Sequence, residues 1–138
     1  MQYYVIKYVN TLPNGFGGTA QGPVIRLQSK YKDDAGLIEH EKTHVRQWYA
    51  VTAIGILIFS MLTLFVSPDL WPAFGLAPCL HPLLYRLVRP YRRWSEVQAY
   101  RKQIATGGYN SHDFAETALV EKYGLRLSVD EARTLLTD

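Results

Sequence analysis

The stretch Asp34–Val66 reads DAGLIEHEKTHVRQWYAVTAIGILIFSMLTLFV and joins two different patterns without a break. Its first part is polar and contains His40-Glu41-Lys42-Thr43-His44, whereas Ala50–Val66 is 17 residues long and has no charged side chain. Asp33 or Asp34 is a suitable N-cap, because an aspartate side chain accepts hydrogen bonds from the first free amides of a helix. The stretch therefore predicts one helix that begins near Ala35 and continues through His44 into the apolar run.

The apolar run is the first limb of a predicted hairpin. As a helix, Ala50–Val66 would reach about 25 Å, at the short end of what crosses a bilayer core. The second limb, Leu70–Val88, is also apolar but contains Pro72, Pro78 and Pro82, which favour a bent or re-entrant return that is helical from Pro82 onward. We expect membrane contact through residues 50–88. The alternative is a soluble protein in which Ala50–Val66 is a fully buried core helix.

Positive charge lies at both ends of this hairpin. Asp69 is the only charged residue among the 39 between Arg46 and Arg86, and arginines follow at positions 86, 89, 92 and 93. By the positive-inside rule, a membrane hairpin with these flanks has both ends on the cytoplasmic side. We therefore expect a membrane-associated protein whose functional site is cytoplasmic, with a soluble cytoplasmic protein as the alternative.

The overall composition narrows the class of protein. Fifteen Lys and Arg against twelve Asp and Glu give a net charge of +3, which is too mild to indicate a nucleic-acid partner. The single cysteine, Cys79, excludes an internal disulfide framework. Met1–Asn10 has neither a basic start nor an apolar run, so no cleavable signal peptide is visible.

His40-Glu41-Lys42-Thr43-His44 is an H-E-x-x-H motif. Residues four apart lie one turn above each other on a helix, so both imidazoles project from one face at a separation that suits one tetrahedral metal ion. Glu41 lies beside them and can reach a water molecule on that ion without being a ligand itself. The ordinary alternative is two surface histidines on a helix without a metal.

A catalytic zinc usually has three protein ligands, so a third is needed. The candidates further along the chain are Glu96, His81, His112 and Asp113. Glu96 is favoured because it lies on the predicted helix Trp94–Thr106, where the small Ala99 permits close approach of another helix. The 51 residues between His44 and Glu96 contain the hairpin, which returns the chain to its starting end. Otherwise Glu96 would be half of a surface ion pair with a neighbouring arginine.

The remaining elements complete an α+β fold that is mainly α. We expect strands at Tyr3–Val9 and Val24–Gln28 around the turn-rich Leu12–Gly18, and helices at Asp113–Tyr123 and Ser128–Leu136, the last with a Ser128/Glu131 capping box. The prediction is a single domain with a small β region (1–32), a metal-binding helix (34–48), an inserted hydrophobic hairpin (49–88), and the Glu96 helix with C-terminal helices (92–138).

An H-E-x-x-H motif on one helix and a glutamate on a later helix resemble the gluzincin class of zinc metallopeptidases. The intervening hydrophobic hairpin is similar to the membrane-embedded branch, the CAAX prenyl protease and heat-shock membrane protease type, and the short chain is more like minimal gluzincins. The resemblance implies a zincin-like core, a Zn²⁺ cofactor held by His40, His44 and Glu96, and a peptide or protein substrate.

The resemblance also implies a mechanism. Zinc lowers the pKa of a bound water, and Glu41 takes its proton as the water attacks a peptide carbonyl, then delivers that proton to the leaving amine. Tyr109 and His112 are the candidate donors to the developing oxyanion. An extended substrate would pair with Val24–Gln28 as an edge strand. Glu96 is not followed by the aspartate with which several gluzincins orient a ligand histidine, which leaves Asp113 for that role.

The leading hypothesis is thus a zinc-dependent metalloendopeptidase that acts at a membrane surface. The alternative is a non-catalytic, zinc-stabilised helical protein anchored to a membrane or a partner through its hairpin. A third possibility is a small toxin or lysis-type protein that acts through the hairpin alone. Glu41 favours the enzyme, because a structural zinc has no use for a carboxylate between its two histidines. The oligomeric state is left open.

Overall fold

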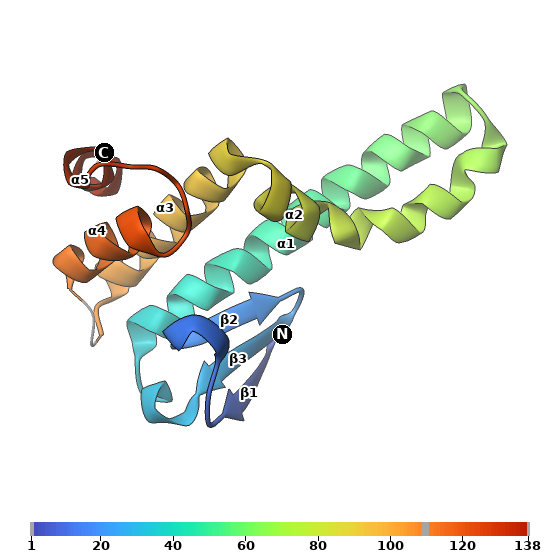
Figure 1. Cartoon of the computed structure of the whole chain (residues 1–138). Coiled ribbons are helices and arrows are strands. Elements are labelled where there is room, and N and C mark those ends of the chain that lie inside the picture. The colour runs from blue at the N-terminus through green and yellow to red at the C-terminus, as the bar shows by residue number, and fades with distance from the viewer. Residues whose placement is uncertain (1, 109–110, 138) are drawn as a thin grey trace.

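The computed structural model describes residues 2–108 and 111–137 of the chain. These residues form mainly helices and one three-stranded sheet, which confirms the predicted α+β class (Figure 1).

The longest element is α1, Ala35–Phe65, a helix of 31 residues. Asp34 is its N-cap and accepts a hydrogen bond of 2.9 Å from the Leu37 amide, as predicted. At 1.5 Å per residue the helix is about 46 Å long. It carries the polar H-E-x-x-H turn and the apolar run on one axis, so the helix continues past residue 48 into the apolar run, as predicted (Figure 1).

The sheet has the order β1-β3-β2, formed by Val5–Val9 (β1), Gly18–Gln21 (β2) and Val24–Gln28 (β3). β1 runs parallel to β3, and β2 runs antiparallel to it. β3 is therefore central, with Ile25 and Leu27 fully buried, and the prediction that Val24–Gln28 is an edge strand was wrong. The edge strand beside α1 is β2, and short 3₁₀ turns, Pro13–Gly15 (η1) and Ser29–Tyr31 (η2), flank the β2–β3 hairpin.

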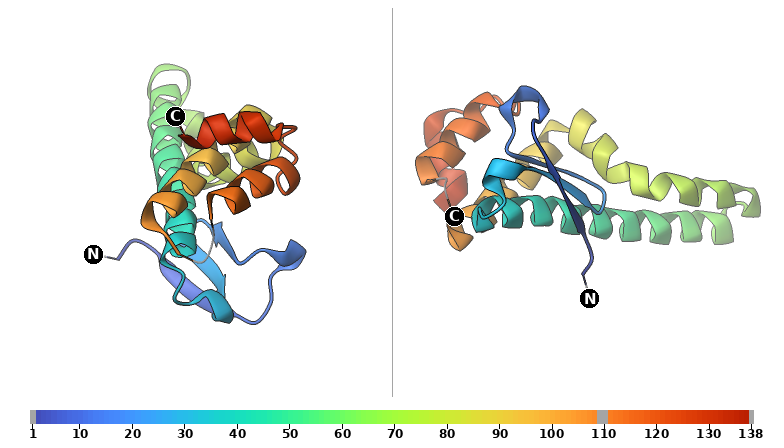
Figure 2. Two further views of the ribbon diagram at one scale, coloured as in Figure 1. Left: turned by 90° about the vertical axis from the view of Figure 1, so that its left-hand side faces the viewer. Right: turned by 90° about the horizontal axis from the view of Figure 1, so that it is seen from below.

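The second half of α1 forms one limb of a hairpin that extends away from the rest of the molecule (Figures 1 and 2). The return limb consists of a 3₁₀ segment, Pro68–Leu76 (η3), and a helix, Ala77–Leu87 (α2). α2 begins five residues before Pro82, because Pro78 falls in its first turn, where a missing amide costs no helical hydrogen bond. Gly55 allows the two limbs to touch, since a Cβ there would lie 2.6 Å from Leu80 Cδ1.

The apolar surface of this hairpin is open. Phe65 is 76% and Trp71 is 68% exposed, and only 6% of the most apolar 18-residue window of α1 is buried. The alternative in which Ala50–Val66 is a core helix of the folded chain was therefore wrong. By length and composition, α1 is sufficient to cross a membrane.

At the opposite end of the molecule are α3 (Arg89–Thr106), α4 (His112–Glu121) and α5 (Val129–Thr137). α3 begins before the predicted Trp94, since Pro90 is compatible with a first helical turn. The predicted capping box of α5 is confirmed, with Ser128 N–H donating to Glu131 Oε2 (2.7 Å) and Glu131 N–H to Ser128 Oγ (3.2 Å). The core of this end comprises Val97, Tyr100, Ala115, Ala118, Leu119, Leu125, Leu127, Ala132 and Leu136.

Candidate metal centre

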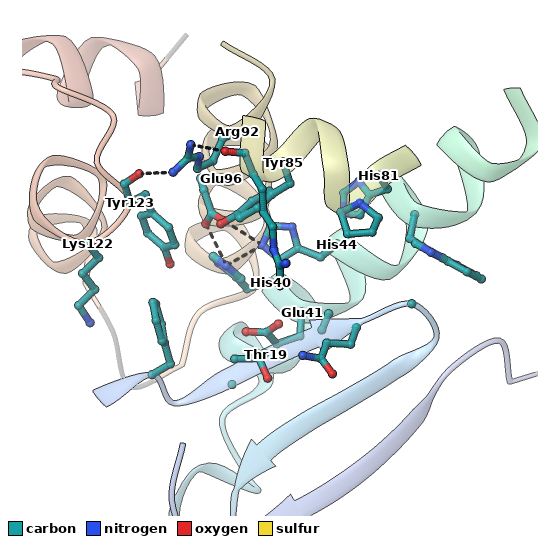
Figure 3. Close-up of a pocket in the computed structure, with 18 of the residues that line it drawn as sticks. Thr19, His40, Glu41, His44, His81, Tyr85, Arg92, Glu96, Lys122 and Tyr123 are labelled. Carbon is teal, nitrogen blue, oxygen red and sulfur yellow. Dashed lines mark hydrogen bonds and ion pairs between the residues drawn. The ribbon is translucent and has the colours of Figure 1, made fainter. Parts of the chain in front are cut away.

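Three side chains predicted to bind a metal converge where α3 crosses α1 (Figure 3). His40 Nε2 and His44 Nε2 are 3.2 Å apart. Glu96 Oε2 lies 3.6 Å from His40 Nε2, and Glu96 Oε1 lies 3.5 Å from His44 Nε2. Glu96 is only 1% exposed, so it is not the surface ion-pair residue of the alternative interpretation. The hairpin returns this glutamate to the two histidines, as the sequence predicted.

The spacing of these atoms fits a zinc ion. Zinc lies about 2.0–2.2 Å from nitrogen and oxygen ligands, so two ligands of a tetrahedral site are about 3.3–3.6 Å apart. The three observed separations, 3.2, 3.5 and 3.6 Å, match that range closely. In addition, Glu96 Oε2 is buried and has no hydrogen-bond donor among the described residues. A carboxylate oxygen in that position is suited to a cation.

Without a metal ion, the cluster is an ion pair. Burial opposes ionisation of Glu96, but the charge of His44 and the closeness of both imidazoles hold its pKa below the usual range. Burial likewise opposes protonation of His44, yet the charge of Glu96 raises the pKa of this imidazole to about 9. A metal ion must therefore displace a proton from His44 when it binds at neutral pH.

Two residues orient His44. Its Nδ1 lies 3.1 Å from Gln47 Oε1 and 3.2 Å from Ser95 Oγ, and Ser95 Oγ donates to Gln47 Oε1 over 2.6 Å. Gln47 Nε2 in turn donates to the Ser95 carbonyl. The amide oxygen accepts only, so Nδ1 carries a proton, and Nε2 is the nitrogen that faces His40 and Glu96.

Asp113 was predicted for this orienting role, but it is exposed in the first turn of α4. Gln47 could have been found from the sequence, because it lies three residues after His44 and thus on the same helix face. Ser95 gives no such signal, since its partner is 51 residues away.

Glu41 lies beside the cluster but is not part of it. Its carboxyl is between the three candidate ligands and Thr19 of β2 (Figure 3). A Cβ on Gly18 would lie 2.8 Å from Glu41 Oε1, so this carboxyl occupies space that only a glycine leaves free. Burial raises the pKa of Glu41 above its ordinary value, against the opposing effect of His40 and His44. A carboxyl with a raised pKa is a better proton acceptor and can also return the proton.

α2 contributes two side chains to the site that sequence reasoning missed or interpreted differently. The Tyr85 hydroxyl donates a short hydrogen bond to Glu96 Oε1. His81, one of the candidates for the third ligand, lies outside the His40–His44–Glu96 cluster; it is buried, pairs through Nδ1 with the Tyr91 hydroxyl (2.7 Å) and lines the pocket. Their spacing of four residues would have placed both on one helix face, had the prolines not argued against a helix there.

The cluster forms part of the wall of a cavity of about 800 Å³. Its other walls come from β2, α2 and the segment that follows α4. His112, predicted as an oxyanion donor, is not among the described residues that line it, because His112 Nδ1 pairs with Glu116 Oε1 (3.0 Å) on α4. Tyr109, the other predicted donor, lies outside the described residues.

Protein-family models, curated proteins and solved structures were compared with the chain, and none of them matches.

Proposed function

We propose that this protein is a zinc-dependent metalloendopeptidase. The observation that carries the proposal is the convergence of His40, His44 and Glu96, with the Glu41 carboxyl beside them but outside the cluster. Two imidazole nitrogens and one carboxylate form a donor set typical of catalytic zinc, which keeps its fourth position for water or substrate. In that position the ion would acidify water and polarise a peptide carbonyl.

Glu41 supplies the acid–base chemistry. It accepts the proton of the attacking water and then delivers it to the amine that leaves. Its raised pKa supports both steps, because a carboxyl that binds its proton more tightly than usual has a pKa closer to neutral pH. A structural metal site would have no use for a buried carboxyl that lies beside its ligands without being one of them.

The edge strand β2 supports the binding of an extended substrate. Gly18, Thr19, Ala20 and Gln21 all line the cavity, and β2 is the terminal strand of the sheet on the side of α1. An extended peptide can add to such an edge through backbone hydrogen bonds. For the oxyanion that develops on the substrate, we propose the Tyr85 hydroxyl as donor in place of His112, because it lies beside the candidate ligands. Its proton, which Glu96 Oε1 accepts in the free protein, would turn to the oxyanion.

The open hairpin supports action at a membrane surface. Its large exposed side chains between Ile54 and Leu76 are apolar, Asp69 is the one charged residue there, and arginines 86, 89 and 93 are exposed where the return limb joins α3. A helix that is apolar on all sides is stable in lipid but not in water. We therefore propose that residues 50–88 contact the bilayer and that the metal site faces the cytoplasm.

Metal content and activity of matched variants test this function. We expect about one zinc per chain in protein purified without chelator, and hydrolysis of labelled casein by protein reconstituted in liposomes. Glu41→Gln should retain zinc and lose the hydrolysis, whereas His44→Ala should lose both.

Glu39→Gln is the control on the same helix, since Glu39 pairs with Lys42 and Arg46 away from the cavity; it should keep zinc and activity. Absence of a transition metal from the parent protein, or full activity of Glu41→Gln, would overturn the proposal.

A further inference from the structure

More basic than acidic side chains line the cavity. Three basic residues, Arg86, Arg92 and Lys122, line it, against two acidic residues, Glu41 and Glu96. Within the described part of the chain, no carboxylate oxygen lies within 4.0 Å of any of the three cations. The basic groups of this cavity are therefore not neutralised by the protein itself.

Arg92 is the fixed member of the three. Its guanidinium donates to the Tyr123 carbonyl (3.1 Å) and the Arg86 carbonyl (3.0 Å), and its centre lies 5.9 Å from the centroid of the Tyr85 ring. Its Nε is buried and has no partner in the described residues. Two neutral carbonyls hold the group in place without cancelling its charge, and a half-buried charge without a counter-ion favours an anionic ligand.

The two acidic residues are engaged elsewhere. Glu96 faces His40 and His44, and Glu41 packs against Gly18 on the β2 side of the cavity. Arg92 lies on the other side of the histidine–glutamate cluster from β2 (Figure 3). Arg86 and Lys122 are exposed, and the three together give this cavity an excess of positive charge that attracts and orients anions.

We infer that this cavity selects substrates with a carboxylate close to the bond that is cut, and that Arg86, Arg92 and Lys122 recognise it. The inference rests on the proposed peptidase function. A peptide extended along β2 would present groups on its far side to the wall that contains Arg92. Guanidinium groups match carboxylates in shape and charge. That carboxylate is either an acidic side chain of the substrate or a free C-terminus.

Three hydroxamate probes test the inference without an assay of activity. Each carries the same zinc-binding hydroxamate and a leucine, followed by a glutamate amide, a glutamine amide, or a glutamine with a free carboxylate. Binding to the zinc-loaded full chain is measured by calorimetry. We expect one or both carboxylate probes to bind about tenfold more tightly than the neutral amide, and this ratio to fall as salt is added. The probe that binds more tightly than the neutral amide shows whether the recognised carboxylate belongs to a side chain or to a C-terminus.

Single substitutions then test whether Arg86 and Lys122, the two exposed cations of the cavity, cause the preference for the carboxylate probes. Arg86→Gln and Lys122→Gln should each reduce the preference by about threefold, with unchanged binding of the neutral amide. Arg89→Gln and Arg93→Gln are matched controls, because both residues are exposed on α3 and do not line the cavity; they should leave the preference intact.

Equal binding of all three probes would overturn this inference and leave the peptidase proposal standing, whereas binding of none would overturn both. Arg86 could instead bind anionic lipid. In that case Arg86→Gln would weaken sedimentation with phosphatidylglycerol vesicles and leave the probe preference unchanged, which also contradicts the inference.

Discussion

At the scale of single residues, Gly18 determines where the Glu41 carboxyl can lie. The glycine is on β2 and the glutamate on α1, and a methyl group on Gly18 would come within 2.9 Å of both Glu41 Oε1 and Cγ. The glutamate would then have to move away from its place beside the histidines. Gly18 is thus a positioning residue for the proposed base, although it has no side chain of its own.

We expect Gly18→Ala to lower kcat/KM by about a hundredfold while zinc content stays near one per chain, because a displacement of about 1 Å in a catalytic group has that effect. Peptidase kinetics and metal analysis on the same preparation measure both quantities. Gly75→Ala is the control, since no atom lies within 4 Å of a Cβ at that position. Parent-like activity of Gly18→Ala would argue against Glu41 as the base.

Gln47 lies one step further from the proposed metal position. It holds the Nδ1 side of His44 together with Ser95 and touches no other candidate ligand. We expect Gln47→Ala to weaken zinc binding by about 10–100-fold, since groups that orient ligand histidines contribute on that scale.

Competition with a chromophoric chelator measures the zinc affinity of the Gln47 variant. Gln47→Glu should restore tight binding, because a carboxylate accepts the same Nδ1–H hydrogen bond. Equal affinity of Gln47→Ala and the parent would show that Ser95 alone orients the ring.

At the scale of elements, the hairpin combines an open apolar surface with a well-packed interior seam at Gly55 and Leu80. Changes on its outer face should therefore affect what it contacts and not how it folds. Leu64 and Phe65 are the natural positions to change, since both are exposed near the tip, at the end of α1.

We expect Phe65→Asp to reduce binding to neutral phosphatidylcholine vesicles by tenfold or more, because each large apolar side chain buried in lipid contributes about 1.5–3 kcal/mol. Sedimentation of protein with vesicles measures this, and the helical circular dichroism should not change. Val5→Asp is the control on the exposed side of β1, far along the chain from the hairpin. If Phe65→Asp binds vesicles like the parent, the proposed membrane contact is wrong.

The elements also show what the sequence could predict. α1 carries its own signals, an aspartate N-cap and residues compatible with a helix throughout, and both its start near Ala35 and its continuation into the apolar run were predicted. β2 was missed because Gly18-Thr19-Ala20-Gln21 lacks the β-branched and aromatic residues that mark a strand, and it becomes one only by pairing with β3. α2 was predicted to begin at Pro82, which is too late, because Pro78 was treated as a helix breaker although it lies in the first turn, where proline is tolerated.

The site divides in the same way. His40, Glu41 and His44 were found from spacing on one helix, and Glu96 from the topology of the hairpin. Tyr85 and Ser95 depend on how α2 and α3 pack on α1, which no local pattern encodes. Gln28 illustrates the same limit: it was predicted as part of a substrate-binding edge, yet its side chain donates to the Phe16 carbonyl inside the fold.

At the scale of the whole molecule, the hairpin extends to one end and the C-terminal helices lie at the other (Figure 2). Its proposed ligands come from α1 and α3, which are joined in sequence only through the hairpin. A metal ion would therefore add a cross-link between two elements that otherwise meet through packing and a few hydrogen bonds, such as those between Gln47 and Ser95. Its removal should loosen the molecule as a whole.

We expect chelation at pH 7 to lower Tm by several degrees, since a ligand at 1,000 times its Kd stabilises a fold by about 4 kcal/mol. The effect of zinc should grow as pH rises from 6 to 8. Protons compete for His44, whose pKa without metal is about 9, so each unit of pH below that value costs about tenfold in affinity.

The same titration has an opposite effect on the metal-free protein. Because folding raises the pKa of His44, its pair with Glu96 stabilises the fold fully below pH of about 6.5, and this contribution is lost as pH approaches 9. Thermal unfolding with and without zinc between pH 6 and 8 measures both trends. A zinc effect that does not depend on pH would contradict binding at His44.

α1 contains no proline and has no helical hydrogen-bond break between His40 and Phe65, so it acts mechanically as a single stiff lever. His40 and His44 lie near the N-terminal end of this lever, and its other end is one limb of the apolar hairpin. A tilt imposed on the apolar half of α1 would thus be transmitted along the helix and would change how the two imidazoles face Glu96. If the proposed membrane contact holds, the thickness and tension of the bilayer would thereby influence how His40 and His44 are aligned with Glu96.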